Sequence, residues 1–396
     1  AVLRGDLGRL DRYFVFLLPL VFASFFLLSK TPQRTLIYLT CLLPMLLYLR
    51  PTVFRVVRRE PVWWLATGLC ALWIVSVAWS GEITTESVFD TVRIGLAVAL
   101  FVHGGIWLAL QRKLPQQRIL NALLLTAAAM GTLTVTLALV PGTETASGHR
   151  LTGFGWAGHS GIGGDIYAFV GLIALVALTE ARGNEPRRIV PLALLFGLCA
   201  FYAVLTESRG AVLALVAGAL VCVALSRPKH VLTVIAAVGV AGIAAYAGGF
   251  VDFASWIDRG SSRRIGIWID SLAKFAENPI LGLGAADVTL LEVGPATFNS
   301  THNIFIAMMV DLGALGLAVF LALTALAVWR AWLVFRAGRG ALLLTLLAFS
   351  YTVMMLHTQT VLLMPAREWL IFWLPLLLLV QQYAVGRGDT APKDRA

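Results

Sequence analysis

Arg209 is a side chain whose surroundings in the sequence suggest chemistry. It lies in LTESRGA, a short polar break between two apolar runs, two residues after Glu207. A guanidinium at such a boundary can present its planar fork to a phosphate and donate two parallel hydrogen bonds. Glu207 either orients Arg209 or only neutralises its charge. The break therefore predicts an anion site, with a simple ion pair as the alternative.

Arg264 lies in the longest polar interruption of the sequence, which runs from Val251 to Asn303. Trp268 follows it by four residues, a spacing that places both side chains on one face of a helix. The two side chains either stack together or belong to an amphipathic helix in a membrane interface. A connection of about fifty residues exceeds the usual length, and such loops tend to be functional or disordered. Its tryptophan and isoleucine residues favour packed short helices.

His302 closes this interruption, in the pattern His302-Asn303-x9-Gly313-x-x-Gly316. A histidine at the end of an apolar helix can titrate near neutrality and act as a general base. A lone histidine at such a boundary is more often only a hydrogen-bonding residue. The arginines in the neighbouring loops favour the catalytic interpretation.

Arg150 lies in a glycine-rich segment, HRLTGFGWAGHSGIGGD, which also contains His159. Glycines let backbone N–H groups approach an anion closely, and they also simply mark loops. We therefore expect Arg150, Arg209 and Arg264 to bind an anion, with His302 as the base. The residues expected to support them are Glu207, Arg263, Trp268, Asn303 and Arg367. For each cation the ordinary alternative is pairing with a nearby acid, or lying along apolar surface.

Motifs that hold divalent cations or nucleotides are absent from the sequence. It contains no Asp-x-Asp, no paired-carboxylate cluster and no Gly-Lys-Ser/Thr phosphate loop. A divalent ion would need several oxygen ligands close together. We therefore expect a reaction without a metal or cofactor, in which arginines supply the positive charge.

Hydropathy identifies the elements that must position these side chains. The chain is 59% hydrophobic and 13% charged, with a mean hydropathy of +0.84, whereas soluble domains carry about 25% charged residues. We expect an all-α polytopic membrane protein with about twelve transmembrane helices. The expected spans are Tyr13–Ser29, Thr35–Leu49, Val62–Trp79, Val88–Leu110, Ile119–Val140, Asp165–Thr179, Ile189–Thr206, Ala211–Leu225, Val231–Phe250, Ile304–Trp329, Ala341–Leu356 and Trp369–Tyr383.

These spans divide the chain into four parts. Residues 1–250 should form nine helices, 251–303 a large loop with short helices, 304–383 three more helices, and 384–396 a tail. If the N-terminus is cytoplasmic, every inner segment carries at least two Lys or Arg residues, as the positive-inside rule requires. Both termini are then cytoplasmic and the large loop faces the periplasm. The formal charge of +10 needs no nucleic acid to explain it.

The motifs, in this order, resemble a superfamily of O-antigen ligases, O-antigen polymerases and bacterial protein O-oligosaccharyltransferases. The resemblance spans residues 150–316. It rests on Ser208-Arg209-Gly210, on the Arg264-x3-Trp268 helix with its Asn278-Pro279…Gly282-x-Gly284 exit, and on His302-Asn303-x9-Gly313-x-x-Gly316. It implies a multi-pass, GT-C-like glycosyltransferase of the bacterial inner membrane, with its active site at the periplasmic face.

The resemblance also implies roles for single residues. The essential histidine of the family corresponds to His302, and its essential arginines correspond to Arg209 and Arg264, with Arg150 as a further diphosphate contact. His159 departs from the asparagine that the family often has in this loop, which weakens the role assigned to that segment. The short segment after the last expected span disfavours the protein ligases, which usually have a longer C-terminal extension.

The activity expected from this resemblance is that of an O-antigen ligase in lipopolysaccharide biosynthesis. It would transfer O-polysaccharide from undecaprenyl diphosphate to lipid A–core within the membrane lipid, by metal-independent inverting transfer. His302 would take a proton from the acceptor, while Arg209 and Arg264 stabilise the departing diphosphate. The motifs leave open an O-antigen polymerase, which uses a second lipid-linked glycan as acceptor. A transporter or flippase of such glycans is the alternative from another class, although the sequence shows no convincing internal repeat.

Overall fold

The computed structural model describes residues 2–138, 140, 146–147, 150–181, 186–226, 235–236, 238–239, 242–243, 246, 263–288 and 290–389. Regular structure in these ranges is almost entirely helical, which confirms the all-α prediction. The strands form two short antiparallel hairpins, β1 (Ala146–Ser147) with β2 (Arg150–Leu151), and β3 (Leu291–Val293) with β4 (Ala296–Phe298). Most of the expected span Val231–Phe250, the expected loop residues 251–262 and the expected tail residues 390–396 lie outside the described residues.

The remaining expected spans each correspond to a helical segment. In chain order the segments are α1 (Val2–Leu27), α2 (Lys30–Leu36), η1 (Ile37–Leu42), α3 (Leu43–Met45), η2 (Leu46–Tyr48), α4 (Pro51–Val57), α5 (Pro61–Val75), η3 (Ser76–Trp79), α6 (Thr85–Leu110), α7 (Gln116–Ala138), η4 (Gly155–Gly158), α8 (Ser160–Glu180), α9 (Pro186–Leu205), α10 (Arg209–Ser226), α13 (Arg264–Glu277), α14 (Ile304–Arg336), α15 (Leu342–His357), η5 (Trp369–Trp373) and α16 (Leu374–Asp389).

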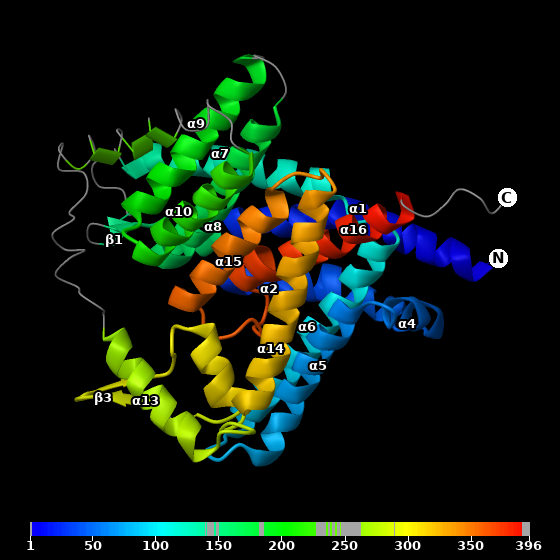
Figure 1. The fold of residues 1–396 in the computed structure, drawn as a ribbon, viewed down its shortest axis with the longest axis vertical. Helices are drawn as coiled ribbons and strands as arrows, with labels where there is room; N and C mark the ends of the chain where they lie inside the picture. Colours follow the sequence, from blue (N-terminus) through cyan, green and yellow to red (C-terminus); the bar gives the residue numbers. More distant parts are fainter. Residues whose placement is uncertain are drawn as a thin grey trace.

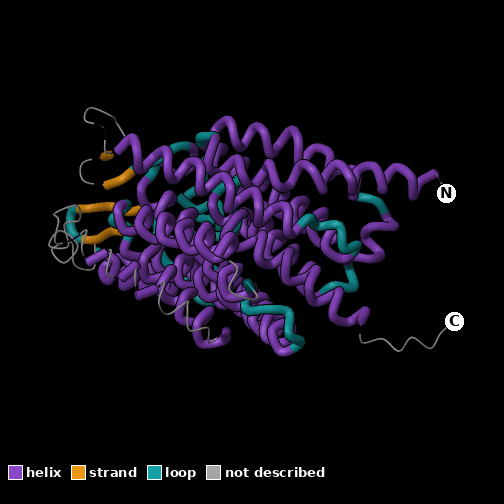
Figure 2. The backbone as a smooth tube through the Cα atoms, turned by 90° about the horizontal axis from the view of Figure 1, so that it is seen from above, coloured by secondary structure: helices purple, strands orange, loops and turns teal. Residues whose placement is uncertain are grey.

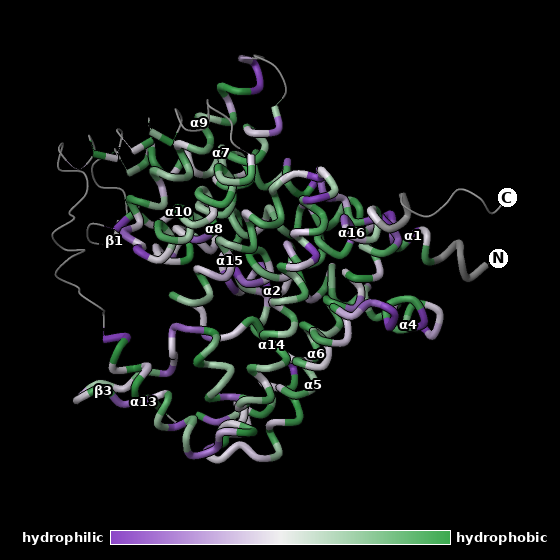
Figure 3. The backbone as a smooth tube through the Cα atoms, in the orientation of Figure 1, coloured by the Kyte–Doolittle hydropathy of each residue, from purple (hydrophilic) through white to green (hydrophobic). Residues whose placement is uncertain are grey.

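The membrane-spanning character of these helices agrees with the expected polytopic protein. Among the described residues, nine helices are long and apolar enough to cross a membrane, or ten if one bent pair counts as a single span. α15 is a shorter apolar helix. In Figure 3 the hydrophobic colour follows the helices, whereas hydrophilic residues gather at α4 and around β1 and α13.

Three local features differ from the expected spans. The helical segment from Lys30 to Tyr48 turns by 90° into α4, because Arg50 is extended before Pro51, as residues before proline usually are. α16 continues to Asp389, past the expected end of its span. The described part of the large loop contains one helix, α13, and the β3–β4 hairpin, where we expected only short helices.

The helices form one bundle with its loops gathered at the ends. α8 packs against α9 and α10, and α10 packs against α15, whereas α5 packs against α6 and α14 (Figure 1). Figure 2 shows the strands at one end of the bundle, and the start of α1 and the end of α16 at the other. The bundle therefore has one end that carries the hairpins and an opposite end that carries the start of α1 and the end of α16.

Charged groups buried within the bundle are paired. Arg330 of α14 forms an ion pair with Glu60 at the start of α5, and both residues are buried. Asp11 accepts hydrogen bonds from Lys113 at 2.6 Å and from the hydroxyl of Tyr48 at 2.7 Å. An unpaired charge in such surroundings would be strongly destabilising, so these contacts fix how the helices pack.

The segment after α13 is held on α14 by backbone hydrogen bonds. α14 is interrupted at Gly313, which has φ of 65° and ψ of −165°. The N–H of Leu283 donates to the carbonyl of Val310 at 2.7 Å, and the N–H of Ala314 donates to the carbonyl of Pro279 at 2.8 Å. A Cβ at Gly313 would overlap the backbone of Ile280. The glycine therefore permits the contact that positions the large loop against the bundle.

We predict that Gly313→Ala destabilises the protein by about 2 kcal/mol or more, because the side chain meets backbone and the φ/ψ region favours glycine. The measurement is thermal unfolding of the purified protein in detergent. Gly68→Ala in α5 is the matched control, since no atom lies near a Cβ placed there and alanine favours helix. Equal stability of the two variants would contradict this role for Gly313.

Candidate active site

A cavity of about 420 Å³ lies where the loops at one end of the bundle meet. Its described lining consists of Arg150, His159, Gly161, Ile162, Glu207, Ser208, Arg209, Arg264, His302, His357 and Arg367. The structure thus brings together the expected base and all three arginines expected to bind the anion, although they come from four separate segments. Within this lining, four arginines and three histidines face one carboxylate.

Four helices begin at or within two residues of this lining. The first residues of these helices are Ser160 in α8, Arg209 in α10, Arg264 in α13 and Ile304 in α14. The first N–H groups of a helix have no intrahelical acceptor, and they carry the positive end of the helix dipole. They therefore add to the positive charge of the arginines, and both features favour an anionic ligand.

The break between α9 and α10 positions Glu207, Ser208 and Arg209. Glu207 has φ of 51°, a value that few residues other than glycine adopt. Gly210 lies so close to the ring of His357 that a Cβ would overlap it. Ser208 is buried, and its hydroxyl has no hydrogen-bond partner among the described residues. Because buried polar groups are normally hydrogen-bonded, this hydroxyl is suited to a bound ligand.

The segment before α14 holds His302 in an uncommon conformation. Its φ is 51°, and its N–H donates to the hydroxyl of Ser300 at 3.2 Å. Nε1 of Trp268 donates to the carbonyl of Thr301 at 3.0 Å and thereby ties α13 to this segment. The side chain of Asn303 accepts hydrogen bonds from two N–H groups in the first turn of α14. Trp268 and Asn303 therefore hold the backbone on either side of His302.

The charges around His302 favour its neutral form. Burial lowers the pKa of His302 below its ordinary value of 6.5, and the nearby side chains of Arg264, His357 and Arg367 lower it further. Burial, and then the charge of Arg209, also lowers the pKa of Arg264, but arginine remains protonated in proteins. A neutral imidazole beside fixed cations can accept a proton.

One wall of the cavity is an ionic network that includes one acid we did not expect there, Asp165. Arg367 forms ion pairs with Asp165 of α8 and, at 2.9 Å, with Glu368. Its Nη2 donates to the carbonyl of His357 at 3.0 Å, and Nδ1 of His357 lies 3.4 Å from Asp165. Burial alone would lower the pKa of Arg367, but the two carboxylates raise it. Asp165 stood at the end of an expected span, where an ionisable residue is itself a functional signal.

The remaining expected residues have different surroundings. Nε of Arg150 donates to the carbonyl of Thr206 at 3.0 Å, so part of its hydrogen-bonding capacity is used within the protein. His159 lines the cavity, and burial, followed by nearby cations, lowers its pKa. Arg263 precedes α13 with φ of 63° and is exposed, outside the described lining. The structure therefore separates the neighbours Arg263 and Arg264 by their access to the cavity.

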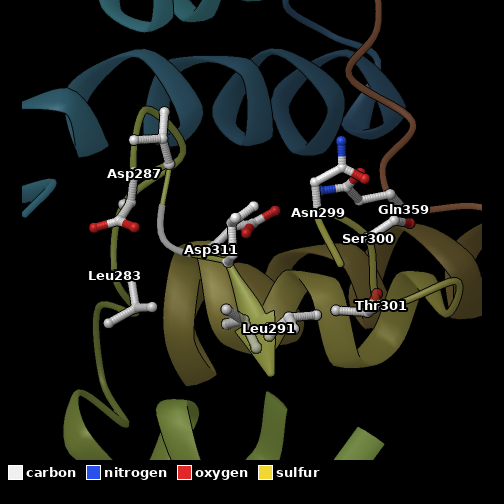
Figure 4. Close-up of a pocket in the computed structure, with 12 residues that line it drawn as sticks. Leu283, Asp287, Leu291, Asn299, Ser300, Thr301, Asp311 and Gln359 are labelled. Atoms are coloured by element: carbon white, nitrogen blue, oxygen red, sulfur yellow. The ribbon is translucent and has the colours of Figure 1, made fainter. Parts of the chain in front are cut away.

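A second cavity, of about 90 Å³, adjoins the first along the segment before α14. Ser300 lines it, whereas His302 lines the larger cavity. Figure 4 shows Asp311 of α14 between Asp287 on one side and Asn299 on the other. Because the described lining holds two carboxylates and no cation, this small cavity disfavours an anion. The larger cavity is the one with charge complementary to a phosphate group.

The side chains of the larger cavity indicate which chemistry it can support. Among the described residues, no group of three or more His, Cys, Asp and Glu side chains is placed to hold a metal ion. The larger cavity combines fixed cations, helix N-termini and a neutral histidine. This combination can stabilise an anionic leaving group while a proton is taken from an attacking hydroxyl.

Comparison with known proteins connects this geometry to a family. The family model for O-antigen ligase matches residues 192–321, a range that includes Arg209, Arg264 and His302. The chain is also similar to an O-antigen ligase of Pseudomonas aeruginosa, with 26% identity over 398 residues, covering 97% of this chain and 96% of that protein. Both comparisons therefore support the resemblance of this chain to O-antigen ligases.

Proposed function

We propose that this chain is a glycosyltransferase that moves O-polysaccharide from undecaprenyl diphosphate to the lipid A–core oligosaccharide. The observation that carries the proposal is the cavity in which Arg150, Arg209 and Arg264 meet His302 at the N-termini of four helices. A diphosphate needs concentrated positive charge, and an attacking sugar hydroxyl needs a proton acceptor. Both requirements are met within one cavity.

The arginines are proposed to hold the diphosphate of the donor. Arg209 opens α10 beside the buried, unpartnered hydroxyl of Ser208, so side-chain and backbone donors lie side by side. Arg264 opens α13 and lies close enough to Arg209 for the two charges to interact. A bound diphosphate would relieve this repulsion. Because these groups supply the charge that the leaving diphosphate requires, the transfer is proposed to be independent of metal ions.

His302 is proposed to act as the general base. The acceptor hydroxyl loses its proton to the neutral imidazole, its oxygen forms a bond to the anomeric carbon of the donor, and the bond from that carbon to the diphosphate oxygen breaks. The arginines receive the charge that develops on the diphosphate. A single displacement of this kind inverts the anomeric configuration.

The reaction is proposed to take place at the periplasmic face of the inner membrane, with both chain termini in the cytoplasm. The hairpins, one of which includes Arg150 of the cavity lining, lie at the end of the bundle opposite the start of α1 and the end of α16. The connection after α6 contacts the first half of α1 through the ion pair between Lys113 and Asp11. The positive-inside rule places connections that carry lysine and arginine in the cytoplasm.

Reconstitution tests the proposed function. The purified protein is placed in vesicles with the lipid-linked glycan and lipid A–core, with EDTA present, in parallel with His302→Ala. We expect a core-linked product with EDTA, with the opposite anomeric configuration to the donor, and a rate about 10²- to 10⁴-fold lower in the variant. Lengthened carrier-linked glycan with unmodified core would instead identify a polymerase. Glycan that crosses the vesicle membrane without any new glycosidic bond would identify a transporter.

We predict that Arg264→Lys lowers the transfer rate about 10²-fold or more, by analogy with other electrostatic stabilisers, because lysine lacks the bidentate fork. Steady-state kinetics in the reconstituted system provide the measurement. Arg263→Lys is the matched control: the same change is made one residue earlier, at an exposed position outside the cavity lining. Nearly full activity in Arg264→Lys would show that the residue is structural.

The pH dependence of kcat/KM should report the lowered pKa of His302. The base must be neutral to accept a proton, so activity is present above its pKa and is lost as the pH falls through it. Since burial and nearby cations lower this pKa, we expect the acid limb to have its midpoint below 6.5. His159→Gln should leave the midpoint in place. If the loss of kcat/KM at acidic pH disappears in His159→Gln, the titrating group is His159 instead.

A further inference from the structure

A second feature of the outer surface lies away from the cavity. A groove of about 300 Å³ runs between α6 and the helical segment from η1 to η2. Leu42 and Leu46 form one wall, and Leu96 and Leu100 form the other. Tyr38 and Arg93 precede these leucines in the two segments and also line the groove. The groove is therefore apolar along most of its length and polar at one end.

The polar end of the groove has hydrogen-bonding capacity that the protein does not use. Nη2 of Arg93 donates to Asp90 at 2.6 Å, but its Nε has no partner among the described residues. The hydroxyl of Tyr38 is also buried without a described partner. Buried donors without acceptors are unfavourable. The side chain of Arg93 is 37% exposed, so the part of its guanidinium beyond the buried Nε is accessible to a ligand in the groove.

Two arginines, Arg34 and Arg93, and two acids, Asp90 and Glu368, interact electrostatically around this end. Arg34 lies one turn before Tyr38, and its Nε donates to the carbonyl of Pro365 at 3.3 Å. Arg93 and Arg34 interact electrostatically with each other, and Asp90 is the acid paired with Arg93. The apolar walls meanwhile face outward: the neighbouring Leu43 and Leu96 are each more than half exposed. Cations above exposed leucines fit a lipid with an anionic headgroup.

The groove is connected to the cavity through one short segment of chain. Nη2 of Arg93 contacts the sulfur of Met364 at 3.0 Å, and Arg34 donates to the next residue, Pro365. Two residues later, Arg367 lines the cavity. A lipid head at Arg93 and a reacting group at His302 would therefore lie on two sides of the same segment.

The two substrates of the proposed reaction make different demands on such a groove. The donor carries its charge on the diphosphate, which the cavity arginines would hold, and its carrier chain needs only an apolar surface. A groove of about 540 Å³ along α9, with no charged residue in its described lining, reaches Val204 near the Glu207–Arg209 break and fits that need. A groove with cations of its own fits a lipid whose phosphates are remote from the reacting hydroxyl.

We propose that the groove between η1 and α6 holds an acyl chain of the acceptor's lipid A, with a lipid A phosphate bound by Arg93 at the polar end of its lining. The proposal rests on the proposed function, because it assigns the acceptor lipid of that reaction. The groove aligns the acceptor so that its core sugars extend over the segment 364–367 toward His302. Arg93 is thus a binding residue for the lipid part of the acceptor and takes no part in the chemical step.

Binding measured without turnover tests this proposal. The full chain with His302→Ala is placed in phosphatidylcholine nanodiscs and titrated with bisphosphorylated lipid A and with the same lipid after removal of both phosphates. We expect the phosphorylated lipid to bind about tenfold more tightly, as charge-assisted hydrogen bonds to a phosphate imply. Arg93→Gln should remove this preference, and Arg93→Lys should keep part of it. Because no transfer is needed, the result does not depend on whether the proposed reaction occurs.

Matched controls separate the groove from the rest of the surface. Leu96→Trp fills the groove and should weaken the binding of both forms of lipid A. Leu125→Trp, on the exposed face of α7, should weaken the binding of neither form. Arg118→Gln removes an exposed arginine at the start of α7 and should preserve the phosphate preference. Equal binding of the two lipids by the chain with an intact groove would overturn the proposal. Displacement of lipid A by phosphatidylglycerol at equal concentration would also overturn it, since it would identify a general anionic-lipid site.

Discussion

The structure depends on holding like charges together in a mostly apolar bundle. Arg150, Arg209, Arg264 and Arg367 line one cavity with three histidines. Acids balance part of this charge by number: Arg367 is paired with Asp165 and Glu368, and Glu207 also lies in the lining. Cations at close range repel one another more strongly in surroundings of low dielectric constant than in water. An anionic ligand removes that penalty, so the fold is complementary to an anion before one binds.

The backbone around the cavity shows how the protein maintains this arrangement. Glu207, Arg263 and His302 all have positive φ, and each directly precedes or lies within two residues of the start of a helix. Such conformations persist only where the surroundings over-determine them. Here the surroundings are the bundle and the loop held on α14 through Gly313. The strained turns direct the helix N-termini and the functional side chains into one space.

The ionic network at Arg367 connects the parts of this site. It joins α8, the end of α15 and the start of η5 through Asp165, His357 and Glu368. The same stretch of chain contacts Arg34 and Arg93 through Pro365 and Met364. The cavity and the groove on the membrane-facing side are therefore built on one segment. This arrangement gives a physical route by which binding of a lipid in the groove aligns a group at His302.

The sequence by itself determined the class of fold and the residue types of the site. Long apolar runs leave helices as the only way to satisfy the backbone in a membrane. The arginines and His302 at the ends of those runs are the residues that line the proposed anion site. Only the tertiary structure decided which of neighbouring residues reach the cavity. Arg264 lines it and Arg263 does not, because a single positive φ turns the chain between them. Asp165 and His357 joined the site through contacts between α8 and α15, and no local pattern encodes contacts between helices so far apart in the chain.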